Sequence, residues 1–98
     1  MHIPSEIKVL AHEYTITINP LLNLETGSMG QCCSNTLKIN IDPNVPESCM
    51  ADTLLHEIIE ALKYQMQLEM EHNVVSALAT GILTVIRDND LDFRKNQS

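Results

Sequence analysis

Hydrophobic residues recur at helical spacing in the middle of the chain, from about residue 47 to about residue 67 or 71. The apolar positions repeat every three or four residues: Leu55, Ile58, Ile59, Leu62 and Met66. Because neither Gly nor Pro interrupts them, the pattern predicts a helix with one face in a core. Pro46-Glu47 forms a suitable first turn, with a proline that needs no amide donor and an acid near the positive helix end. Since apolar residues cover more than half of the circumference, we expect a mostly buried helix whose polar stripe faces a cleft or solvent.

A second helical pattern begins near Asn73, which is a suitable N-cap. Its apolar positions again follow helical spacing: Val74, Val75, Leu78, Ile82, Val85 and Ile86. Gly81 inside this helix costs about 1 kcal/mol relative to Ala, which predicts a close approach to a neighbouring element. The run Asp88-Asn89-Asp90 stops the helix.

Short β-prone runs fill the first half of the chain. Residues 7–10 and 14–18 read as one hairpin with His12 in its turn, and residues 29–33 and 36–41 read as a second hairpin. A connecting loop with a short helical turn is expected over residues 21–28. The alternation of apolar and polar residues in 36–41 indicates one buried and one wet face, which suits a strand at the sheet edge.

Together these elements predict an α+β fold, with a small antiparallel sheet of about four strands packed on two helices. The length of 98 residues fits one domain, residues 1–98, with a frayed tail over 91–98. The core should be aliphatic and rich in Met, because the chain has two Tyr, one Phe and no Trp.

Charge and cysteine usage narrow the classes of function. A net charge of −7, with six Lys and Arg residues that form no basic patch, argues against nucleic acid as a partner. No apolar run approaches the length of a membrane span, and no targeting signal is visible, so we expect a soluble intracellular protein with no membrane contact. Three cysteines without regular spacing fit a reducing compartment better than a disulfide framework.

The candidate chemistry lies on the central helix. At 3.6 residues per turn, His56 and Glu60 lie about 40° apart on one side, so both can bind one metal ion. Imidazole nitrogen and carboxylate oxygen are zinc ligands, and Glu57 beside them is placed to polarise a water. A catalytic zinc site needs a third protein ligand. The nearest downstream candidate is His72, provided that the connecting loop brings it back along the helix.

Spacing alone also fits a plainer interpretation. On a solvated helix face, Glu57, Glu60 and Lys63 would make ordinary surface pairs, with Lys63 well placed three residues after Glu60.

The order of elements adds a family resemblance that covers residues 7–89. A hairpin, a Gly-Gln-Cys strand, a Leu-Leu-His-Glu-Ile-Ile-Glu-Ala-Leu helix and a closing Leu-Ala-Thr-Gly-Ile-Leu helix are similar to small phage and prophage proteins related to minimal zincin metallopeptidases. These include the ImmA/IrrE and SprT-like types. The resemblance implies a zinc site with His56 as first ligand and Glu57 as general base. The usual His-Glu-x-x-His pattern has a second histidine where this chain has Glu60, and His72 would supply the remaining ligand.

The function that this resemblance implies is that of a zinc-binding protein of the bacterial cytoplasm, with hydrolysis of peptide bonds as the expected activity. An extended peptide or protein substrate would add itself to the strand over 36–41, and Tyr64 is a candidate for stabilising the oxyanion. One alternative is a non-catalytic phage or prophage protein of the same fold that acts by protein contact. A second is a small acidic regulator or nucleic-acid mimic, although the acids of the first half form no clear stripe. The oligomeric state is left open.

Overall fold

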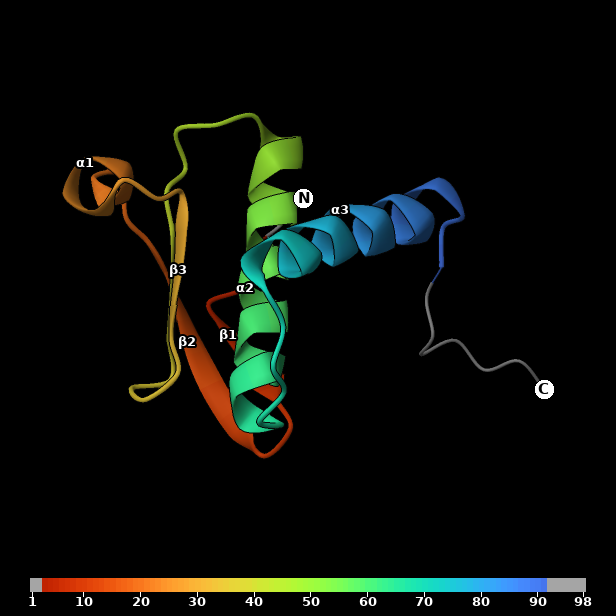
Figure 1. The fold of residues 1–98 in the computed structure, drawn as a ribbon. Helices are drawn as coiled ribbons and strands as arrows, with labels where there is room; N and C mark the ends of the chain where they lie inside the picture. Colours follow the sequence, from red (N-terminus) through yellow and green to blue (C-terminus); the bar gives the residue numbers. More distant parts are fainter. Residues whose placement is uncertain (1–2, 92–98) are drawn as a thin grey trace.

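The computed structural model describes residues 3–91 and shows a four-stranded sheet with two long helices (Figure 1). The α+β class and the two helices are as the sequence predicts. The expected tail lies outside the described residues from 92 onward. The elements follow in this order: β1 (Glu6–Val9), β2 (His12–Ile18), α1 (Leu22–Thr26), β3 (Gly30–Cys33), β4 (Lys38–Ile41), α2 (Glu47–Gln65) and α3 (His72–Asp88).

The sheet is mixed, whereas the sequence predicted an antiparallel one. The strand order is β1-β2-β4-β3. Both predicted hairpins, β1 with β2 and β3 with β4, are antiparallel. They join through β2 and β4, which run parallel with Ile16 opposite Ile39. Turn residues and alternation report on each hairpin, but the pairing between hairpins depends on the crossover through α1, which carries no such local signal.

The edge strand beside the helices is β3, and the expectation that residues 36–41 form an edge is wrong. β4 lies between β2 and β3, with Ile39 and Ile41 fully buried and Lys38 exposed. Alternation of apolar and polar residues shows that a strand has one buried face. It does not show whether both neighbouring strand positions are filled.

The first hairpin turns tightly at Leu10-Ala11, where Leu10 has a φ of 57°. Positive φ at the first turn position is typical of the two-residue turns that suit strand twist. His12 was expected in this turn, but it is the first residue of β2, paired with Val9 and exposed. It lies outside the group of side chains described below.

Helix α2 packs on the sheet, and their contact forms the main core. The phenol of Tyr14 is fully buried, donates to Ser34 Oγ at 2.8 Å and accepts from Gln65 Nε2 at 2.9 Å. This chain of hydrogen bonds links the middle of β2 to both the β3–β4 turn and the end of α2. The buried apolar residues of the core are Val9, Tyr14, Ile16, Ile39, Ile41, Leu54 and Ala61.

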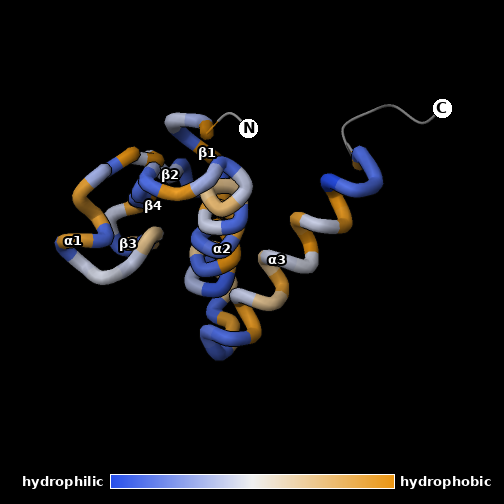
Figure 2. The backbone as a smooth tube through the Cα atoms, turned by 90° about the horizontal axis from the view of Figure 1, so that it is seen from above, coloured by the Kyte–Doolittle hydropathy of each residue, from blue (hydrophilic) through white to orange (hydrophobic). Residues whose placement is uncertain are grey.

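Helix α3 packs against α2 and then projects beyond the body of the protein (Figure 2). Its contact with α2 is a small cluster in which Val75 and Ala79 meet Ile59. The helix begins at His72, one residue before the expected N-cap, with Glu71 in extended conformation as the cap. Gly81 was expected to make a close approach, but a Cβ built there meets nothing within 4 Å. Within residues 3–91, no helix combines the length and hydropathy that crossing a membrane requires.

Candidate metal centre

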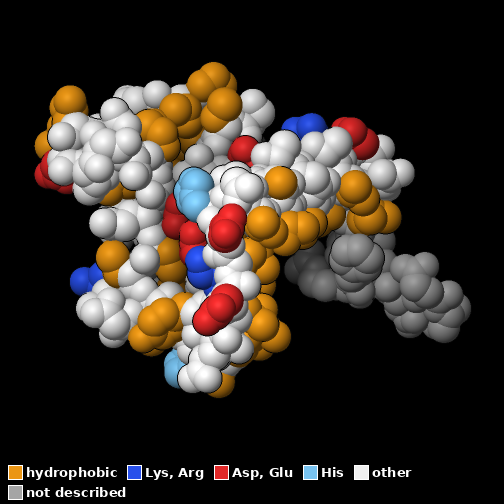
Figure 3. Space-filling model, in the orientation of Figure 1, with side chains coloured by type: hydrophobic (Ala, Val, Ile, Leu, Met, Phe, Trp, Pro, Cys, Tyr) orange, Lys and Arg blue, Asp and Glu red, His pale blue; other side chains and the backbone are white. Residues whose placement is uncertain are grey.

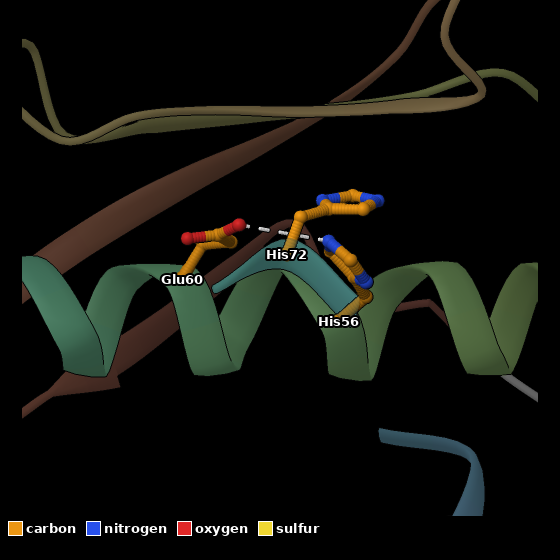
Figure 4. A group of neighbouring side chains, drawn as sticks. All are labelled: His56, Glu60 and His72. Carbon is orange, nitrogen blue, oxygen red and sulfur yellow. Dashed lines mark ion pairs between the residues drawn. The ribbon is translucent and has the colours of Figure 1, made fainter. Parts of the chain in front are cut away.

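His56 and Glu60 lie one turn apart on α2 and point to the same side of the helix (Figure 4). His56 Nε2 is 3.7 Å from Glu60 Oε2. Their side chains are 17% and 24% exposed, so both are reachable from solvent while most of their surface is covered. The helical spacing alone places these two atoms together, as the sequence predicts.

His72 reaches the same point because the chain turns back after α2. Residues 66–71 run alongside α2 in the reverse direction before α3 begins (Figure 1). The reversal occurs at Gln67, whose φ is 55°, and Leu68 N donates to Lys63 O at 2.9 Å. The imidazole of His72 then lies beside that of His56, with ring centroids 4.8 Å apart. The loop thus makes the return that the sequence interpretation required.

The ligand atoms of His56, Glu60 and His72 all lie within 4.8 Å of one another, so this group can hold a metal ion. Tetrahedral zinc with ligands at 2.0–2.2 Å separates its ligand atoms by about 3.4 Å. The pair on α2 is already near that spacing, and His72 stands at the exposed start of α3, where its side chain can turn inward. Two imidazoles and one carboxylate make a donor set that suits zinc and leaves a fourth position open.

The surroundings of His56 favour a neutral imidazole. Burial lowers its pKa, and the neighbouring His72 lowers it further, while Glu60 acts in the opposite direction. Its second ring nitrogen, Nδ1, lies 3.4 Å from Ser76 Oγ on α3. With Nδ1–H donating to this hydroxyl, the lone pair of Nε2 faces Glu60 and the metal position. Metal binding requires a deprotonated ring nitrogen of this kind.

Lys63 connects Glu60 to the returning loop. Its Nζ lies 3.2 Å from Glu60 Oε1 and donates to Met70 O at 2.8 Å. The ion pair with Glu60 is the one expected from their spacing, whereas the bond to Met70 had no sequence signal because the loop path is not a local property. Lys63 leaves Oε2 of Glu60 directed at His56 and fastens the segment that carries His72.

We expect Lys63→Met to loosen residues 66–71. Losing the hydrogen bond to Met70 O costs about 1 kcal/mol, which corresponds to roughly fivefold faster amide exchange when the loop opens locally. Hydrogen–deuterium exchange of the metal-free protein measures this directly. Lys38→Met, at an exposed position of β4, is the matched control and should leave the same amides unchanged. Equal exchange in both variants would contradict the role of Lys63.

Glu57 is buried, with 7% of its surface exposed, on the side of α2 that faces β3. This excludes the interpretation of Glu57 as one of several surface pairs on a solvated face. A Cβ built on Gly30 of β3 would lie 2.5 Å from Thr53 Cγ2 and 2.7 Å from Glu57 Oε2. Gly30 therefore provides the space in which the Glu57 carboxyl sits, a role that sequence analysis missed.

Burial and, to a smaller extent, the charge of the nearby Glu60 raise the pKa of Glu57 to about 7. A carboxyl group poised near neutral pH can both accept and donate a proton under working conditions. A cation held by Glu60 and the two histidines would favour the carboxylate form of Glu57, because a nearby positive charge favours the charged form.

The raised pKa predicts how the stability of the metal-free protein depends on pH. Between the ordinary value of 4.5 and about 7, the folded chain holds a proton on Glu57 that the unfolded chain releases. Stability is therefore lost as pH rises through this window, by up to about 3 kcal/mol. Urea unfolding in the presence of a chelator should show that Glu57→Gln removes this loss. Glu69→Gln, at an exposed acid, should keep it, and a Glu57→Gln profile that follows wild type would contradict the assignment.

A cleft of about 890 Å³ lies between helix α2 and β3 with its turn, and it is lined by His56, Glu57, Glu60, Lys63 and His72. In Figure 3, acidic, basic and histidine side chains gather where the sheet meets the helices. A second hollow of about 280 Å³ shares Gly30, His56, Glu57 and His72 with the first and continues toward Asp52 and Thr80. The candidate metal centre therefore lies where the two hollows meet.

The exposed edge of β3 borders this cleft. Asp42 N donates to Met29 O at 2.9 Å, which makes this pair a hydrogen-bonded one. Because such pairs alternate along an antiparallel ladder, Gly30 and Cys32 turn their amide and carbonyl groups away from β4. These groups remain available to an added strand.

Tyr64, the candidate for stabilising the oxyanion, and Cys32 also line the cleft. Tyr64 is 57% exposed there. Burial raises the pKa of the Cys32 thiol, whose Sγ lies 3.3 Å from Ser34 Oγ, and so disfavours the thiolate form of this cysteine.

A scan against protein-family models and searches of curated proteins and of solved structures find no match.

Proposed function

We propose that this chain is a zincin-like protein of the phage and prophage type that binds zinc through His56, Glu60 and His72 and hydrolyses peptide bonds. The convergence of three zinc-type ligands from two separate elements beside a buried carboxyl carries the proposal. The pair on α2 follows from helical spacing, but the position of His72 does not. A surface cluster that arises by chance would not be expected to include a residue such as His72, which joins the group only because the loop over residues 66–71 runs back along α2.

Zinc at this position would supply Lewis acidity, lowering the pKa of a water and polarising a peptide carbonyl. Glu57 acts as the general base, because its carboxyl lines the same cleft as His56 and its pKa is raised to about 7. Glu57 then returns the proton to the leaving amine. Tyr64 at the exposed wall of the cleft is placed to donate to the oxyanion.

The substrate that fits this cleft is an extended peptide segment. It would pair with the outward amide and carbonyl groups of Gly30 and Cys32 and so extend the sheet by one strand. This places the substrate on β3, not on residues 36–41, because β4 has both neighbours filled. We place the protein in the bacterial cytoplasm, which suits its free cysteines Cys32, Cys33 and Cys49.

The proposal is tested by incubating the untagged protein with an unfolded protein such as reduced casein. We expect cleavage that stops on addition of a chelator and returns with zinc. Mass spectrometry of the products should show cuts that are absent when the His56→Ala variant is used. Cleavage that survives both the chelator and this substitution would come from a contaminant and would contradict the proposal.

One observation favours the non-catalytic alternative. Glu60 stands where the related pattern has a histidine, and Lys63 pairs with its Oε1 at 3.2 Å. A carboxylate shared with a lysine donates less charge to a metal, which weakens its control of the water and the substrate carbonyl. Stoichiometric zinc without any cleavage would select this alternative, in which the protein acts by contact with a protein partner.

A further inference from the structure

Helix α3 carries an apolar stripe that no part of the described chain covers. Five large side chains on α3 follow helical spacing, and together with Leu91 just beyond the helix end they are each 36–53% exposed. In Figure 3, apolar atoms continue along one side of α3 from the body toward its end. We call this set the α3 stripe, and its members are Val74, Leu78, Ile82, Val85, Ile86 and Leu91.

The α3 stripe is distinct from the face that holds the metal centre. Val75 and Ala79 face α2, and Ser76 and Thr80 line the smaller hollow beside His56. At 100° per residue, Leu78 and Ile82 point away from Ser76 and Thr80. A partner on the stripe would therefore leave the cleft open.

The spacing of the stripe specifies a helix as its partner. Val74, Leu78, Gly81 and Val85 are separated by four, three and four residues, which is the repeat with which one helix packs along another. Gly81 lies in the middle, with open space around its missing Cβ, and Ala77 flanks it. Small residues at that point let a second helix approach closely. The glycine costs helix stability and has no packing partner within residues 3–91.

Symmetry and charge identify the partner as a second copy. If two α3 helices lie antiparallel about an axis between Gly81 and Ile82, each Ile82 fills the space above the other Gly81, and each Leu78 meets the other Val85. The helix has no charged residue between Asn73 and Ile86 in a chain of net charge −7, so the middle of the two packed helices brings no charges together. Residues 92–98 supply one large apolar side chain, Phe93, which is too little to cover six.

We propose that this protein forms a two-fold homodimer through antiparallel packing of the α3 stripe. The packing buries on each copy the side chains that α3 presents beyond α2 (Figure 2). Because the stripe faces away from His56, the dimer forms with or without metal. If the protein proved to be monomeric, the proposed zinc centre would be unaffected.

Sedimentation equilibrium of the full chain, from about 1 to about 200 µM in the presence of reductant, tests this proposal. We expect a reversible monomer–dimer equilibrium in that range. Ile82→Asp should raise the dissociation constant at least about thirtyfold, because it buries a charge against the second copy. Thr84→Asp adds the same charge on the opposite side of α3 and should change the constant by less than about threefold.

Gly81→Gln keeps the test decisive if Ile82→Asp fails to fold. Since nothing lies within 4 Å of a Cβ at Gly81, the monomer accommodates the new side chain and gains helix propensity. The dimer should nevertheless weaken at least about tenfold, because close helix approach is lost. A wild-type chain that stays monomeric throughout, including one that binds lipid vesicles instead, would overturn the proposal. So would a dimer indifferent to both Ile82→Asp and Gly81→Gln.

Discussion

Replacing His56 or His72 with Ala should each lower the affinity for zinc by at least about a hundredfold. Each substitution removes one of the three proposed ligands, and the remaining pair would hold the ion with only one imidazole. The effect should be similar for both, because the two rings lie side by side at the metal position. Competition with a chromophoric chelator at pH 7.5 measures the dissociation constant directly.

His12→Ala is the matched control for this experiment. His12 is an exposed histidine at the start of β2 and lies outside the group formed by His56, Glu60 and His72. It should leave zinc affinity within about twofold of wild type. If His12→Ala weakens binding as much as His56→Ala, or if neither cleft histidine matters, zinc is bound elsewhere and the assignment is wrong.

Glu57→Gln should retain zinc and lower the kcat for peptide hydrolysis by about 10²- to 10⁴-fold. Gln has the same shape, so it fits the space opposite Gly30. It has no basic oxygen that accepts a proton at neutral pH, which is the role assigned to Glu57. Metal content and cleavage rate are to be measured on the same preparation, because the prediction requires the zinc content to stay unchanged and the cleavage rate to fall.

Glu69→Gln tests whether loss of any acid near the cleft has this effect. Glu69 is exposed on the returning loop and does not line the main cleft. Its variant should cleave at the wild-type rate. Full activity in Glu57→Gln would show that another group takes the proton, whereas a parallel loss of zinc and activity would make Glu57 a structural residue.

Much of the fold was predictable because it depends on local patterns. The long helix followed from apolar positions such as Leu55 and Ile58, and both hairpins followed from alternation around short turns. The approach of His56 and Glu60 is equally local, because it needs only one helical turn. The burial of Glu57 was harder to predict from the sequence, since it depends on a glycine 27 positions earlier in the chain.

The remaining features depend on contacts between distant segments. Whether β4 lies at an edge is decided by whether β2 pairs with β4 or with β3, and alternation in residues 36–41 is the same in either case. The position of His72 depends on a left-handed residue at Gln67 and on Lys63 reaching Met70 O. Gly81 was expected to contact the rest of its own chain, yet it lies in the uncovered stripe of α3.

The central claim is that two imidazoles and one carboxylate of this chain hold one zinc ion. Elemental analysis of protein purified without a histidine tag, combined with X-ray absorption at the zinc edge, tests it most directly. We predict about one zinc per chain, with nitrogen and oxygen ligands at 2.0–2.2 Å, an imidazole scattering pattern and no sulfur. Protein that carries no zinc and takes up none when it is added, or a first shell that contains sulfur, would contradict the claim.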